Sequence, residues 1–137
     1  MTDEPQLMTD EEYRAALERY VVKWQPLLGL QNWHIAVVVT KDVLSNNVLA
    51  DIAWTPHYRH ATMGSSIKHV TFHEIDFAEE HIERTAVHEL CHLLLAPIRD
   101  VIHNQFDGES FGWLAFKGRQ ETVVDELTNL ILRLYKG

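Results

Sequence analysis

The sequence predicts a single α+β domain over residues 1–137, in the order helix, small sheet, helix, long loop and helix. Three observations predict this class. Apolar residues recur at helical spacing near both ends of the chain and again in its middle. Short runs rich in β-branched residues, which favour strands, lie between the first two helical segments. The composition is 46% hydrophobic, enough for one domain with a buried core. Residues 1–9 are expected to form a flexible lead-in.

The first predicted helix follows Thr9, whose hydroxyl can cap its N-terminus. Its apolar positions recur every three or four residues and are Tyr13, Ala16, Leu17, Tyr20, Val21 and Trp24. Pro26 ends or kinks this helix, and Gly29 marks a break after it. The sheet that follows is expected to be mostly antiparallel. Its three to four strands are predicted at residues 33–39, 48–55, 58–67 and 70–72.

Two more helices are predicted in the second half of the chain. The first runs over residues 77–95 and stops before Pro97. Residues 97–118 contain a proline and three glycines, so we expect a long loop there. A loop of this length inside a compact domain is often functional. The last helix runs over residues 119–135 and has a regular apolar stripe.

The charge and cysteine content of the chain restrict which partners and which cellular compartment we expect for it. The chain has 12 basic and 20 acidic side chains, a net charge of −8, which argues against nucleic acid or an anionic membrane as the main partner. No apolar run approaches the roughly 18 residues of a membrane-spanning helix. The acidic start at Met1–Pro5 lacks the hydrophobic segment of a secretory signal. Cys91 is the only cysteine, so no internal disulfide can form. Together these features favour the reducing cytoplasm.

The middle helix carries the pattern H-E-x-x-H, formed by His88, Glu89 and His92. Histidines four positions apart lie on one face of a helix, so both imidazoles can reach one metal ion. Glu89 lies about 100° round the helix, where its carboxylate can act as general base toward a metal-activated water. Zinc is the metal that this pattern predicts. The alternative is that both histidines are core residues that bond to backbone or side-chain groups.

A catalytic zinc needs a third protein ligand and one open coordination position. The last helix offers Glu121 and Asp125, which are four positions apart and share a face bordering the apolar stripe. Glu121 is the better candidate for the ligand, and Asp125 could hydrogen-bond the far nitrogen of a ligating histidine. Glu126 falls on a polar face and is expected to be solvated. Alternatively, Glu121 is a carboxylate stabilised by the dipole at the helix N-terminus.

The H-E-x-x-H pattern followed by Glu121-x-x-x-Asp125 resembles the gluzincin class of zinc metallopeptidases. In particular it is similar to the small ImmA/IrrE-type metallopeptidases common in phages, prophages and mobile elements. The resemblance covers residues 77–135. It implies the following roles: zinc ligands His88, His92 and Glu121, general base Glu89, and Asp125 as the group that supports a ligand. It also implies a peptide substrate along the edge strand of the sheet, which we expect at residues 58–63. The chain lacks a clear helix-turn-helix segment, so a fused DNA-binding regulator is not expected.

Two other zinc protease classes can be weighed on the same residues. Metzincins need a glycine and a histidine where this chain has Leu95 and Ile98, so that class is excluded. SprT-like proteases take their third ligand from a histidine beyond the motif, and His103 in the expected loop could fill that role. The Glu121 and Asp125 pair argues against this alternative, as does the lack of a cysteine pair for a zinc ribbon.

The sequence therefore predicts a cytoplasmic zinc peptidase whose substrate is a peptide or protein, with a zinc-activated water as nucleophile and Glu89 as general base. Tyr58, His60 or His103 could stabilise the oxyanion. A second hypothesis is a non-catalytic, zinc-stabilised module that binds a protein partner, its site closed by His103 or Asp125. A third is a metal-free core in which the motif arises by chance.

Overall fold

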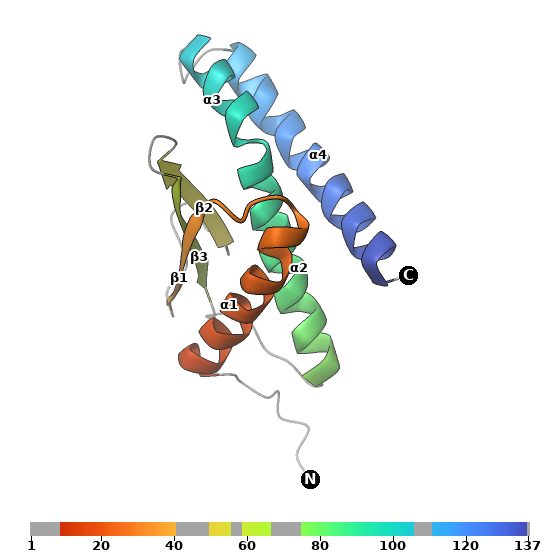
Figure 1. Ribbon diagram of the computed structural model, residues 1–137. Helices are drawn as coiled ribbons and strands as arrows, with labels where there is room; N and C mark the ends of the chain where they lie inside the picture. The colour runs from red at the N-terminus through yellow and green to blue at the C-terminus, as the bar shows by residue number, and fades with distance from the viewer. Residues whose placement is uncertain (1–8, 41–49, 56–58, 67–74, 106–110, 137) are drawn as a thin grey trace.

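The computed structural model describes residues 9–40, 50–55, 59–66, 75–105 and 111–136. Within these ranges the chain forms four helices and one three-stranded sheet, which confirms the α+β class. In chain order the elements are α1 (Asp10–Leu27), β1 (His34–Thr40), β2 (Ala50–Thr55), β3 (His60–Ser66), α2 (Ile75–Leu94), α3 (Ala96–Gln105) and α4 (Phe111–Lys136). Figure 1 shows α2 at the centre, with the sheet on one side and α4 on the other. No helix among the described residues is long and apolar enough to cross a membrane.

Helix α1 begins and ends where its capping residues predict. The Thr9 hydroxyl accepts a hydrogen bond from the Glu12 N–H at 3.1 Å, and the Glu12 carboxylate accepts from the Thr9 N–H at 3.3 Å. This reciprocal capping box satisfies two backbone donors at the helix start. The helix ends one residue beyond Pro26, because Gly29 then takes a left-handed conformation with φ of 74°.

The sheet is mixed, where the sequence led us to expect a mostly antiparallel one. Its strand order is β1-β3-β2, with β1 parallel to β3 and β2 antiparallel to it. The expectation that residues 58–63 form the edge strand is therefore wrong, because His60–Met63 belong to the central strand. The alternate residues Ala61, Met63 and Ser65 share one face of β3, and all three are buried. The possible strand at residues 70–72 lies outside the described residues, as does most of the expected flexible lead-in.

The long loop expected over residues 97–118 is also wrong, because most of that segment is helical. Helix α3 covers its first part, and α4 starts at Phe111 rather than at residue 119. Pro97 is the second residue of α3, where its missing N–H has no helical partner to lose. Within α4 the two glycines are outweighed by tertiary packing, since Trp113 between them is 5% exposed. The helix expected over residues 77–95 is confirmed as α2.

Contacts between α1 and α2 determine which face of α2 is turned toward α4. Glu83 of α2 is 3% exposed, and its carboxylate accepts hydrogen bonds from Trp24 Nε1 and Lys23 Nζ of α1, both at 2.8 Å. A buried carboxylate needs such donors, so these bonds keep Glu83 on the α1 side of α2. At 100° per residue, His88 and His92 lie about 140° and 180° round the helix from Glu83. Both histidines therefore face away from α1.

Candidate metal centre

The two motif histidines lie one turn apart on α2 and project toward α4. The side chains of His88 and His92 are 24% and 12% exposed, and their ring centroids are 5.2 Å apart. Their neighbours on the same helix, Leu90 and Cys91, are fully buried, so the helix backbone at this point is fixed by packing on the remaining sides. The histidine face is thus rigidly presented to α4.

Helix α4 supplies two carboxylates to this face. Glu121 Oε1 lies 3.0 Å from His92 Nε2, and Glu121 Oε2 lies 3.6 Å from His88 Nε2. Asp125, one turn further along α4, places Oδ1 3.2 Å from His88 Nδ1. The two nitrogens of His88 therefore meet different carboxylates.

Packing between α2 and α4 holds these carboxylates in place. Val124 and Thr128 of α4 are buried, and Cys91 of α2 contacts the Thr128 hydroxyl. Seven residues before Cys91, Arg84 of α2 donates a hydrogen bond to Asn129, which follows Thr128 on α4. These contacts lie along one side of α4, which brings Glu121 and Asp125 over the histidines.

The donor set and its spacing fit a zinc ion. The metal-binding atoms that His88, His92 and Glu121 offer all lie within 4.8 Å of one another. Two ligands each about 2.0–2.1 Å from a tetrahedral zinc are separated by roughly 3.3 Å. The two Glu121 distances, 3.0 and 3.6 Å, lie on either side of that value. The group could therefore hold a metal ion with small side-chain movements.

Burial and charge keep His92 in the form that binds a metal. Burial is the largest influence and lowers the pKa of His92, and the neighbouring His88 and Arg99 side chains act in the same direction. The Glu121 carboxylate raises the pKa of His92, but burial outweighs it. A lowered pKa leaves the imidazole neutral at pH 7, with a lone pair free for coordination.

Glu89 lies beside the metal cluster, the name used here for His88, His92 and Glu121, and is not one of its members. The residue is 5% exposed, and its Oε1 is 4.0 Å from His88 Nε2. By contrast, the Glu121 side chain is 60% exposed, so one side of the cluster is open to solvent. The arrangement combines three convergent ligand atoms, a buried carboxylate next to them and access from outside.

The structure thus brings together the residues that the sequence singled out on two helices, although His92 and Glu121 are 29 positions apart in the chain. Glu126 is exposed, as expected. His60 begins β3, where its ring packs against that of His34 at a centroid distance of 5.1 Å. The backbone of His103 belongs to α3, but its side chain lies outside the described residues, as does Tyr58. The ligand roles themselves, and the choice between Glu121 and His103, stay predictions.

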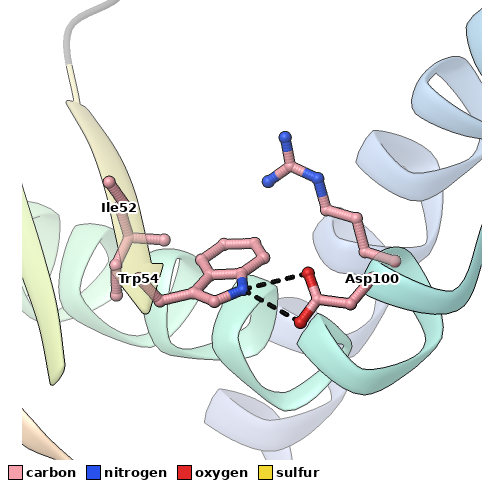
Figure 2. A pocket seen from close by; sticks show the side chains of 5 residues that line it. Ile52, Trp54 and Asp100 are labelled. Carbon is pink, nitrogen blue, oxygen red and sulfur yellow. Dashed lines mark hydrogen bonds between the residues drawn. The ribbon is translucent and has the colours of Figure 1, made fainter. Parts of the chain in front are cut away.

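A second feature, which the sequence did not predict, is a cavity of about 300 Å³ between β2 and α3. It is lined by Ile52, Ala53, Trp54, Arg99 and Asp100. Figure 2 shows Trp54 reaching from the strand toward Asp100, whose carboxylate accepts from the indole Nε1 at 3.3 and 3.4 Å. No signal in the sequence pointed to this cavity, because the two sides of it are 45 residues apart and α3 was expected to be a loop.

Comparison of the chain with protein-family models, with curated proteins and with solved structures gives no match.

Proposed function

We propose that this protein is a zinc-dependent peptidase of gluzincin type, similar to the small ImmA/IrrE-type enzymes. The observation that carries the proposal is the convergence of His88 Nε2 and His92 Nε2 on the Glu121 carboxylate, across two helices. In this proposal those three residues hold the metal. Zinc bound there supplies a water of lowered pKa and a Lewis acid for the scissile carbonyl.

Glu89 is the proposed general base. Its carboxylate is buried and lies 4.0 Å from the ligating nitrogen of His88, so it is within reach of a water that approaches the cluster. In the proposed reaction it accepts a proton from the attacking water and passes it to the nitrogen of the leaving amine. Asp125 supports the site, because a carboxylate at Nδ1 of His88 keeps the proton on that nitrogen and leaves Nε2 for the metal.

The substrate in this proposal is a peptide or protein segment that adds to the sheet beside β2. Strand β2 is at the end of the strand order, pairs with β3 on one side and contacts α2, the helix that carries the motif. Within the described residues its other edge has no strand partner, so its backbone groups can bind an extended peptide. The reducing cytoplasm remains the proposed compartment, which suits a chain with one buried cysteine.

Two observations favour this function over a closed, structural zinc site. The exposed side of Glu121 leaves room for a substrate and a water at the metal. Asp125, which could close the site, faces Nδ1 of His88 instead of the nitrogen that faces Glu121. A SprT-like site with His103 as third ligand is the alternative that the experiment has to separate.

The test is the zinc content of untagged protein, measured by mass spectrometry for the wild type and for Glu121→Ala, His103→Ala and Glu126→Ala. We expect one zinc per chain in the wild type, loss or strong weakening in Glu121→Ala, and no change in the other two. Glu126→Ala is the matched control, because it removes an exposed carboxylate from the same helix. Loss in His103→Ala alone would favour the SprT-like site, and no zinc in the wild type after zinc addition would refute the proposal.

A second measurement tests for catalysis. The zinc-loaded wild type and Glu89→Gln are each incubated with a mixture of peptides from a digested proteome, and new peptide ends are identified by mass spectrometry. We expect cleavage by the wild type only, with zinc retained in the variant. Equal cleavage by both proteins would remove Glu89 from its proposed role.

A further inference from the structure

The cavity between β2 and α3 contains a guanidinium group, that of Arg99, whose N–H donors have no acceptor among the residues that the structure describes. The Arg99 guanidinium carbon lies 4.8 Å from the ring centroid of Trp54 and 5.7 Å from that of Trp113. These cation–π contacts hold the flat group in place through its faces. Among the residues that the structure describes, the Arg99 guanidinium has no hydrogen bond or ion pair with an acceptor. The described residues thus supply no acceptor that would compete with a ligand for its N–H groups.

The other charged groups near the cavity do not cancel this cation. Asp100 lines the same cavity, but its carboxylate accepts from Trp54 Nε1. A neighbouring hollow of about 270 Å³ shares Asp100 and is also lined by Arg59. Two guanidinium groups and one carboxylate thus line this region, in a chain whose overall charge is −8.

The cavity lies where a side chain of a bound peptide would enter it. It is lined by three successive residues of the edge strand β2, Ile52 to Trp54. Side chains of Ile52 and Trp54 share one face of the strand, and alternate side chains of a peptide paired with β2 project from that same face. Arg99 lies in the first turn of α3, which begins two residues after the end of the motif helix α2.

We propose that this cavity is a subsite for an acidic side chain of the substrate, and that Arg99 is the residue that determines this specificity. The inference rests on the proposed function for the identity of the ligand as a peptide. A guanidinium binds a carboxylate in a bidentate manner, and the two tryptophan rings pre-organise the Arg99 guanidinium for that contact. Peptides with Glu or Asp at the position that faces Arg99 are the expected substrates.

The test uses two mixtures of fluorescein-labelled eight-residue peptides, random except for a fixed central Glu in one and Gln in the other. Binding to zinc-loaded Glu89→Gln protein is followed by fluorescence polarisation, so that cleavage does not interfere. We expect the Glu mixture to bind about tenfold more tightly, the size of one charge-assisted hydrogen bond. The preference should shrink in 0.5 M salt, because the cavity is open to solvent and its charges are screened.

Four further variants on the same background locate the preference. Arg99→Gln should reduce the preference for Glu to less than twofold, and Arg99→Lys should keep part of it. Asp100→Asn should increase the preference, because it removes a negative charge that repels the Glu carboxylate of the peptide. Arg133→Gln is the control, because it removes an exposed arginine near the C-terminal end of α4. Circular dichroism checks that each variant is folded. If Arg99→Gln does not fold, the comparison is made with Arg99→Lys instead.

The outcomes separate this inference from the proposed peptidase function. Equal binding of both mixtures, no binding of either, or a preference that survives Arg99→Gln would overturn the subsite. Zinc content is measured in the same samples. If the chain lacks zinc but prefers Glu through Arg99, the subsite is supported and the peptidase function is refuted. If the chain holds zinc but shows no preference, the subsite is refuted and the peptidase function still stands.

Discussion

Replacement of Asp125 by asparagine tests whether the carboxylate behind His88 supports metal binding. Asp125 Oδ1 lies 3.2 Å from His88 Nδ1, while His88 Nε2 faces Glu121. Asparagine keeps the size of the side chain and an oxygen acceptor but removes the negative charge. The substitution therefore isolates the electrostatic part of the contact, with little change in packing because the side chain is 63% exposed.

The expected loss of zinc affinity follows from that exposure. Removing a group that hydrogen-bonds a ligating histidine weakens metal binding by about 10- to 100-fold. Solvent screens a contact between a histidine and a largely exposed carboxylate, so we expect the lower end, about tenfold or about 1.4 kcal/mol. Glu121→Ala removes a ligand and should weaken binding by a much larger factor.

The assay is competition for zinc with a fluorescent chelator at pH 7.0, with wild type, Asp125→Asn and Glu126→Gln in parallel. Zinc also stabilises the fold by mass action, by about 2.7 kcal/mol at a free zinc concentration 100 times the Kd. At one fixed zinc concentration, the variant should lose about 1.4 kcal/mol of that gain in urea unfolding. An unchanged affinity in Asp125→Asn, or an equal loss in Glu126→Gln, would refute the reasoning.

Three further predictions concern catalysis, folding and pH. Glu89→Gln should reduce peptide cleavage by about 10²- to 10⁴-fold at unchanged zinc content, because it removes the proposed proton acceptor; a cleavage assay and metal analysis check this. Trp24→Phe should destabilise the fold by about 1–3 kcal/mol in urea, because the buried Glu83 carboxylate loses a donor at 2.8 Å. Burial raises the pKa of Tyr13 above its ordinary 10.0, against the opposing hydrogen bond to Ser65. The folded chain then holds this proton more tightly than the unfolded chain, so the stability present below pH 10 falls as pH rises further. Tyr13→Phe should flatten that fall in urea unfolding between pH 9 and pH 11, and an unchanged slope would contradict the assignment.

Much of the candidate site could be predicted because its patterns are local. The spacing of His88 and His92 fixes their shared helix face, and the spacing of Glu121 and Asp125 does the same on α4. Amphipathic patterning was less reliable for α4, where Val124 is buried but Val123, Leu130 and Leu134 of the apolar stripe are exposed. That α2 and α4 pack so that these two faces meet is a fact of tertiary structure, and the sequence supported it only through resemblance to a known class.

The errors arose where tertiary contacts override local signals. Pro97 and the glycines of α4 suggested a loop, but Trp113 packs into the fold and α3 starts at a position that tolerates proline. The alternation of apolar and polar residues along a strand predicts which side chains share a face of the sheet, but it does not predict which strands are neighbours. It therefore could not show that β3 is central and β2 is at the edge. The cavity around Arg99 was not predicted for both of these reasons. It forms only because α3 is a helix and β2 is the strand next to it.

By itself, the sequence determined the helix faces, the caps of α1 and the chemistry of the motif residues, because these depend on spacings within one helix. Only the tertiary structure decided that Glu121 approaches both histidines, that β2 borders the motif helix and that Arg99 stacks on two tryptophans. Those features depend on how side chains from distant segments fill one core together, and no local periodicity encodes that packing.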